Sequence, residues 1–189
     1  MATQDSRIKL KRSTVNSTVP TVPSSNDHTD GTWIATDIYK GELFYNQADG
    51  VLWSRDDNGV TCLGGSASLT ISSADVLQLN STPLTIVNGI SGMVIVPISA
   101  ILKSTYNSAT YATNLGIFLR HTGSSSPITE NSNKLGFTSN IINQFTLRND
   151  TDEDQLISGA NLEVFVDSGN PTAGDSDITV FVNYRLIPA

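Results

Sequence analysis

Three aspartates at alternate positions, Asp150, Asp152 and Asp154, are the residues whose types and spacing best suit metal chemistry. Carboxylates spaced in this way open one common calcium-binding loop, in which oxygen ligands surround the ion. Here, however, Gln155 stands where that loop needs its turn glycine, and Asn161 where it needs a bidentate glutamate. We therefore interpret the run as a solvated acidic turn between two strands, with a Ca²⁺ site as the alternative. We expect no cofactor.

The residues needed for nucleophilic or general acid–base catalysis are sparse. The sequence has two histidines, His28 and His121, and no serine in a G-x-S-x-G nucleophile elbow. We expect His121 at a strand end, facing water. Cys62 is the single cysteine and has no histidine near it in the sequence, so we expect a small buried apolar residue. Carboxylates such as Glu163 and Asp167 do not by themselves indicate a hydrolase. We predict that the protein is not an enzyme.

Two tyrosines, Tyr106 and Tyr111, lie in a polar loop before an expected strand at 115–121. Exposed aromatic rings stack on sugars, so these residues are candidates for contact with a glycan or a receptor. Tyrosine is also common at subunit interfaces. We favour the interface for both residues and keep the glycan contact as the alternative.

The elements that must position these residues are strands. Charged residues make up only 15% of the chain, and short segments of alternating or β-branched residues are separated by polar turns. A short segment at Ser73–Leu79 is compatible with strand or helix, because Ser and Asp stand in capping positions. The pattern predicts an all-β protein whose C-terminal part is a jelly-roll-like β-sandwich. Its expected strands are Leu69–Ser72, Val76–Leu79, Thr85–Val87, Met93–Ile98, Ile101–Ser104, Leu115–His121, Lys134–Phe137, Gln144–Asn149, Leu162–Asp167 and Asp177–Ile187.

A small β-meander precedes this part, over residues 41–63. Gly50 is expected in the left-handed region at its first turn, and Asp57-Asn58-Gly59 forms its second turn. Three short strands cannot bury their own large apolar side chains. We therefore predict that four of these side chains pack between subunits or against the rest of the chain. They are Leu43, Phe44, Tyr45 and Trp53.

The chain divides into three predicted parts: an extended arm at 1–32, the meander at 33–65 and the sandwich at 66–189. The boundary at 65 rests on Gly64-Gly65-Ser66, which we interpret as a linker. Net charge differs along the chain, because residues 1–12 carry +3 and the remainder −10. An acidic body disfavours nucleic acid as a partner. No apolar run approaches the roughly 20 residues of a membrane span, and Met1–Arg12 lacks the apolar core of a signal peptide.

Two stretches resemble proteins of tailed-bacteriophage virions. RIKLKRSTVNSTVP, followed by KGELFYNQADGVLW and RDDNGV, resembles an N-terminal segment in which a basic start precedes a GEL-x-x-N-x-x-DG-x-L hairpin. ISSADVLQLNSTPLTIV, with Gly174-Asp175 and the terminal ITVFVNYRLI, is similar to a C-terminal β-sandwich domain of phage head-fibre, decoration and tail proteins. The positions that match the first segment are Lys11-Arg12-Ser13, Gly41-Glu42-Leu43, Asn46, Asp49-Gly50 and Leu52.

The resemblance implies a homotrimeric structural protein, made in the host cytoplasm and carried on the virion surface. It implies that the arm attaches to capsid, portal or tail subunits and that the sandwich faces outward. We expect a head decoration protein or short head fibre. The alternative is a short receptor-binding tail protein that contacts a host glycan or receptor, and the third hypothesis is a carbohydrate-binding module. The particle-anchoring residues would be Arg7, Ile8, Lys9, Leu10, Lys11 and Arg12.

Overall fold

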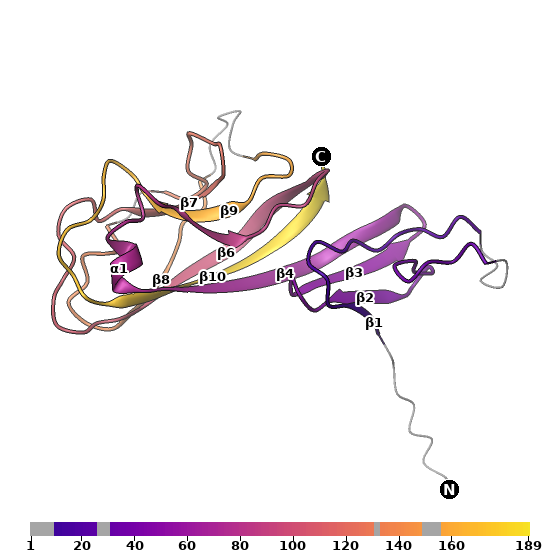
Figure 1. The fold of residues 1–189 in the computed structure, drawn as a ribbon, viewed down its shortest axis with the longest axis horizontal. Coiled ribbons are helices and arrows are strands. Elements are labelled where there is room, and N and C mark those ends of the chain that lie inside the picture. Colours follow the sequence, from indigo (N-terminus) through magenta and orange to yellow (C-terminus); the bar gives the residue numbers. More distant parts are fainter. Residues whose placement is uncertain (1–9, 26–30, 131–132, 149–155) are drawn as a thin grey trace, which may run out of the picture. The chain divides into compact units, whose positions relative to one another are not determined.

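The computed structural model describes residues 10–25, 31–130, 133–148 and 156–189. It divides into two compact units, Met1–Gly64 and Gly65–Ala189. The structure is nearly all β, as the sequence predicts, and contains a large mixed sheet and a small sheet (Figure 1). The large sheet has the strand order β1-β2-β3-β4-β10-β6-β8, and the small sheet has the order β5-β9-β7.

The N-terminal unit is a meander with one added strand. β2 (Leu43–Asn46) pairs antiparallel with β3 (Val51–Asp56), and Gly50 between them has a φ of 66°, the predicted left-handed conformation. β4 (Gly59–Ile71) begins in this unit, and β1 (Lys11–Ser13) lies parallel to β2. Residues 11–13 are therefore an edge strand of the sheet.

The large aromatic side chains of the meander are covered within one chain. Phe44 pairs with Trp53 across the two strands, and each side chain is only 1% exposed. Phe44 and Trp53 therefore pack against the rest of the same chain, which is one of the two predicted alternatives, and they do not need a subunit interface to remove them from water. Leu43 is half-buried and Tyr45 is 36% exposed on the opposite face, so their interface role stays a prediction.

The C-terminal unit is built around its last strand. β10 (Asp177–Pro188) lies between β4 and β6 (Met93–Thr105) and pairs antiparallel with both. Alternate β10 side chains from Ile178 to Leu186 are buried, which is the pattern of a strand with one face in the core. Figure 1 shows the small sheet as a separate layer over this one. The remaining strands are β5 (Leu84–Val87), β7 (Ile117–His121), β8 (Ile141–Gln144) and β9 (Leu162–Val166).

Three local predictions need correction or completion. Residues 93–105 form the single strand β6, with a register shift opposite Asn183 and Tyr184 that leaves Ile98 unpaired. Pro97 lies beside this shift because proline has no N–H to donate to a ladder. Lys134–Phe137 is not a strand, since it consists of a turn at 134–135 followed by irregular backbone, and the edge strand is β8, whose polar and apolar residues do not alternate. α1 (Ser73–Val76) is a short helix capped by Ser72, whose Oγ accepts the Asp75 N–H.

The glycine pair at 64–65 is not a linker. Both residues lie within the thirteen-residue strand β4, at the boundary between the two units. Gly65 pairs with Tyr184 of β10, and a Cβ added to Gly65 would lie 2.6 Å from the Tyr184 Cζ. Tyr184 is 1% exposed, so its ring has little room to move. Gly65 is therefore needed for the packing of a buried aromatic ring, and the sequence alone could not distinguish this role from flexibility.

We predict that Gly65→Ala destabilises the C-terminal unit by about 1–3 kcal/mol, the usual cost of overpacking. The added methyl group must displace the Tyr184 ring. Urea unfolding followed by far-UV circular dichroism measures the change. Gly64→Ala is the matched control, because no atom lies within 4 Å of its added Cβ. Equal stability of the two variants would contradict this role of Gly65.

Candidate functional site

Asn46 is the polar centre of the N-terminal unit. It is 1% exposed, and its Nδ2 donates to the backbone carbonyls of Val15 and Thr18, each at 3.1 Å, and to the Asp49 carboxylate at 2.6 Å. Its Oδ1 accepts the N–H of Ala48 at 3.0 Å. A single buried amide thus links the turn after β1 to the β2–β3 hairpin.

The other matching positions of the hairpin support the same contacts. The Asp49 carboxylate also accepts the N–H of Ser17 at 2.6 Å, so the hairpin loop contacts the arm at a second place. Glu42 accepts the N–H of Tyr39 at 2.7 Å, and Gly41 has a φ of 80°. The residues that resemble the phage segment are therefore the ones that fold residues 11–18 on to the hairpin. Within the predicted arm at 1–32, residues 13–18 thus fold against the hairpin of their own chain.

The basic residues of β1 lie in different environments. The Lys11 amine donates to the carbonyl of Asp37 and lies 3.5 Å from the centre of the Trp33 ring, a cation–π contact. Arg12 is exposed, and no hydrogen bond or ion pair of its side chain is found in the part of the chain that the structure describes. Lys11 thus has an internal role, whereas Arg12 is available to a partner. Arg7, Ile8 and Lys9 lie outside the described residues.

Arg12 borders a shallow hollow on the exposed side of the N-terminal unit. Leu10, Arg12, Tyr45 and Gln47 line this hollow, whose volume is about 540 Å³. Arg12 pairs with Tyr45 across β1 and β2, and Leu10 is 44% exposed. An exposed cation beside apolar side chains is a suitable contact for a protein partner with a complementary acidic group.

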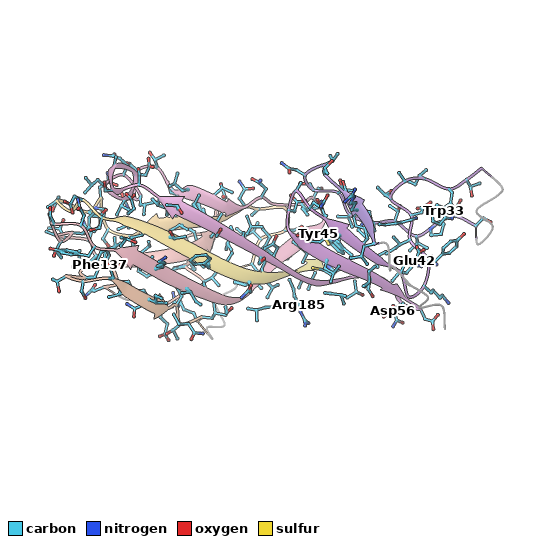
Figure 2. The ribbon with its side chains drawn as sticks, turned by 90° about the horizontal axis from the view of Figure 1, so that it is seen from below. Trp33, Glu42, Tyr45, Asp56, Phe137 and Arg185 are labelled. Atoms are coloured by element: carbon cyan, nitrogen blue, oxygen red, sulfur yellow. The ribbon has the colours of Figure 1, made fainter. Side chains whose placement is uncertain are left out.

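The C-terminal unit has a second exposed surface, on the side of the large sheet that Figure 2 faces. We name it the open face and define it by the outward residues of β4 from Ser66 onward and of β10, β6 and β8. Phe181 and Ile101 are directly paired on it, with exposures of 43% and 38%, and Ile142 is 72% exposed. Large apolar side chains gathered on one exposed sheet face indicate an interaction surface.

The charge of the open face differs from that of the whole chain. Lys103 and Arg185 are its cations, and Asp177 at one end is the single carboxylate among its strand residues. The Asp177 carboxylate also accepts the N–H of Ser73 at 2.9 Å. The chain as a whole carries a net charge of −7. The strand residues of the open face therefore carry a small net positive charge on a chain that is acidic as a whole.

The two loop tyrosines have structural roles. Tyr111 is 2% exposed, its hydroxyl donates to the carbonyl of Ser176 at 2.6 Å, and burial raises its pKa to about 12. Both tyrosine rings meet Phe137 edge to face, and the Tyr106 hydroxyl donates to the carbonyl of Ser108 at 2.8 Å. Tyr111 is therefore buried in its own chain, and the predictions of a glycan contact or a subunit interface are wrong for it. Tyr106 is half-buried, and its role stays a prediction.

His121 is buried, contrary to the expectation of a side chain in water. Its Nε2 lies 2.9 Å from the carbonyl of Ile95, and its Nδ1 accepts the N–H of Ile157 at 2.6 Å. Because Nδ1 is an acceptor, the proton must be on Nε2, and burial lowers the His121 pKa in favour of this neutral form. Both ring nitrogens bond to backbone groups, so His121 joins the end of β7 to β6 and to the segment before β9.

Asp150, Asp152 and Asp154 lie outside the described residues. Within the described ranges, no three or more His, Cys, Asp or Glu side chains are grouped so that they could hold a metal ion. Nor does any helix there have the length and apolar character needed to cross a membrane. Cys62 is buried, as predicted.

Comparison with protein-family models and with curated proteins gives no match. Among solved structures, the chain is similar to a chain of the cyanophage Pam1 capsid asymmetric unit, with 16% sequence identity and a TM-score of 0.38. The match covers 66% of this chain and 86% of that chain. At this TM-score the likeness carries no argument about function.

We predict that Asn46→Ala destabilises the N-terminal unit by about 2–4 kcal/mol, because it leaves several buried polar groups without partners. Both tryptophans, Trp33 and Trp53, belong to this unit, so tryptophan fluorescence during urea unfolding reports on it directly. The matched control is Asn58→Ala in the exposed second turn, which should cost less than about 0.5 kcal/mol. Similar losses in both variants would contradict the role of Asn46.

Proposed function

We propose that the protein is a non-enzymatic structural component of a tailed-phage virion, carried on the particle surface as a head decoration protein or short head fibre. One observation carries this proposal. The residues that resemble the attachment segment of such proteins form one structural device, in which Asn46 and Asp49 hold the basic strand against the hairpin. The resembling residues thus hold the basic strand in a fixed position on the hairpin, which agrees with a role in attachment.

In this proposal the N-terminal unit binds a capsid or other virion subunit. Arg12 and the adjoining hollow supply an exposed cation with Leu10 and Tyr45 beside it. The partner would present an acidic group and an apolar side chain. Arg7, Ile8 and Lys9 precede this strand and would extend the basic contact. Lys11 has a supporting role, because its amine is already bonded within the unit.

The open face supports assembly into a homotrimer. Phe181, Ile101 and Ile142 are exposed in the single chain, and the surface between them is mainly hydroxyl and amide groups. Covering the apolar side chains would stabilise an interface, and the hydroxyl and amide groups between them would need hydrogen-bond partners from the neighbouring copy. A trimer would also bring three attachment strands to one particle, and linked sites bind far more tightly than single ones when all can engage.

A short receptor-binding tail protein remains the second candidate. The specific observation in its favour is the loop region of the C-terminal unit, where many side chain–backbone hydrogen bonds fix the loop conformation. The Asp175 carboxylate, for example, accepts bonds from the Ser108 hydroxyl and from the N–H groups of Ser108 and Ala109, and these bonds lower its pKa to about 2. Loops held in this way are suited to present a fixed surface to a receptor.

We predict that Arg12→Glu reduces binding to particles that lack this protein by about tenfold or more, because it reverses the charge of each attachment strand. Co-sedimentation of purified protein with particles measures the change. A deletion of residues 1–14 would be a less specific test, because it would also remove β1. Lys40→Glu is the matched control, since Lys40 is an exposed residue of the same unit that pairs with Asp57. Attachment through Arg12 is refuted if both variants bind equally.

We predict that the purified protein sediments as a trimer at micromolar concentration and that Phe181→Lys dissociates it. Three lysines brought together on a covered surface would repel one another and resist desolvation. Ile34→Lys, at a residue that is 55% exposed in the N-terminal unit, is the control and should stay trimeric. Sedimentation velocity measures all three proteins. A monomeric parent protein would contradict the proposed assembly, and a trimeric Phe181→Lys variant would contradict the role of the open face.

A further inference from the structure

A pocket in the C-terminal unit combines features that neither attachment nor assembly requires. We name it the end pocket; it is lined by residues between 113 and 118, by Asn133 and by Asp167 and Ser168, and its volume is about 310 Å³. That volume lies at the lower end of the roughly 300–1,000 Å³ typical of small-molecule sites. Asp167 and Ser168 directly follow β9, so a core strand fixes the position of one wall.

Polar side chains around the end pocket differ in whether they have partners. Two of the lining residues are bonded to neighbouring loops, since Asn114 donates to the carbonyl of Asn170 at 3.0 Å and Thr113 bonds to Thr172 at 2.9 Å. Three other lining residues differ from them. In the described ranges, no hydrogen bond or ion pair is found for the side chains of three exposed residues, which are Asn133, Asp167 and Ser168.

The backbone of the pocket wall is held in a costly conformation. Thr113, Asn114 and Ser168 have φ values of 52°, 47° and 67°, and all three line the end pocket. Positive φ is unfavourable for residues other than glycine, and above all for a β-branched threonine. Such strain concentrates where a loop has a function to perform. Thus the end pocket pairs a fixed, strained wall with hydrogen-bonding groups that have no partner.

Two large apolar residues, Leu115 and Phe118, also line the pocket. Phe118 is only 4% exposed, so Leu115 supplies most of the accessible apolar surface. Leu115 is fixed because its carbonyl accepts the N–H of Leu135 at 3.2 Å, and the carbonyl of Asn133 accepts the N–H of Gly136 at 3.4 Å. The pocket therefore presents a carboxylate, an amide and a hydroxyl beside an aliphatic surface.

We propose that the end pocket binds a neutral sugar, either a free monosaccharide or the terminal residue of a glycan. Hydroxyl groups of a sugar ring donate to the Asp167 carboxylate and exchange hydrogen bonds with the amide of Asn133 and the hydroxyl of Ser168. The C–H face of the ring packs on Leu115. Anionic sugars are disfavoured, because Asp167 would repel them and the chain carries a net charge of −7.

This inference goes beyond the proposed attachment, and either can fail alone. Sugar binding is a property of the purified protein, whereas attachment needs the particle. The end pocket also replaces Tyr111 as the place for a glycan contact, because the Tyr111 ring is buried. A divalent cation is the competing occupant of a site with one carboxylate and neutral oxygens, and the test below includes it.

The test is a titration of ¹⁵N-labelled full-length protein with glucose, galactose, mannose, N-acetylglucosamine, N-acetylgalactosamine and rhamnose at millimolar concentrations. At least one sugar should shift the amide signals of residues 113–118, 133 and 167–168 in a saturable way. A glycan array with the same protein shows whether a terminal glycan residue binds in place of, or in addition to, the free sugar. Calcium chloride is titrated separately.

Asp167→Asn should weaken the binding by about tenfold, the effect of losing one charge-assisted hydrogen bond. Its side chain is exposed and has no partner, so the fold should survive, and the amide spectrum shows whether it does. Asn133→Ala is a second variant with the same expectation. Tyr106→Phe is the matched control and should bind normally, because it removes only a hydroxyl outside the pocket. The proposal is overturned if no sugar or glycan binds, if Asp167→Asn binds as well as the parent, or if calcium alone shifts these signals.

Discussion

A buried side-chain amide must find hydrogen-bond partners, and Asn46 finds its partners in segments far from it in the sequence. The carbonyls of Val15 and Thr18 belong to the chain that follows the basic strand, and Asp49 belongs to the hairpin loop. Leaving these groups unpaired would cost several times the stability that one exposed hydrogen bond provides. The position of Arg12 on the protein surface therefore depends on Asn46, which is itself buried.

The C-terminal unit depends on a different constraint, the close approach of β10 to β4. The buried ring of Tyr184 can be accommodated because residue 65 has no side chain. Once β10 is held in this register, Phe181 falls opposite Ile101 and faces outward with it. The core and the exposed surface are thus set by the same alternation along one strand. A change that shifted this register by one residue would exchange the two faces.

Much of the fold follows from the sequence, but its contacts across long distances do not. The alternation in 177–187 and the turn residues Asp49-Gly50 predict β10 and the hairpin, because these signals are local. The burial of Phe44, Trp53 and Tyr111 depends on segments distant in the chain, so the sequence left a subunit interface open for all three where the structure has a core. The same limit applies to Gly65, because its role becomes visible only in its pairing with Tyr184. Neither the open face nor the end pocket can be recognised from a local pattern in the sequence, because each combines residues from several strands or loops.

In the proposed assembly, the N-terminal unit attaches to the particle and the open face of the C-terminal unit joins the copies. An electron cryomicroscopy reconstruction of phage particles incubated with the purified protein tests both assignments directly. We expect three copies around a threefold axis, with β1 and Arg12 against a virion subunit and Phe181 covered by a neighbouring copy. Density in which the N-terminal unit faces solvent, or particles that carry no density for the protein, would contradict the proposal.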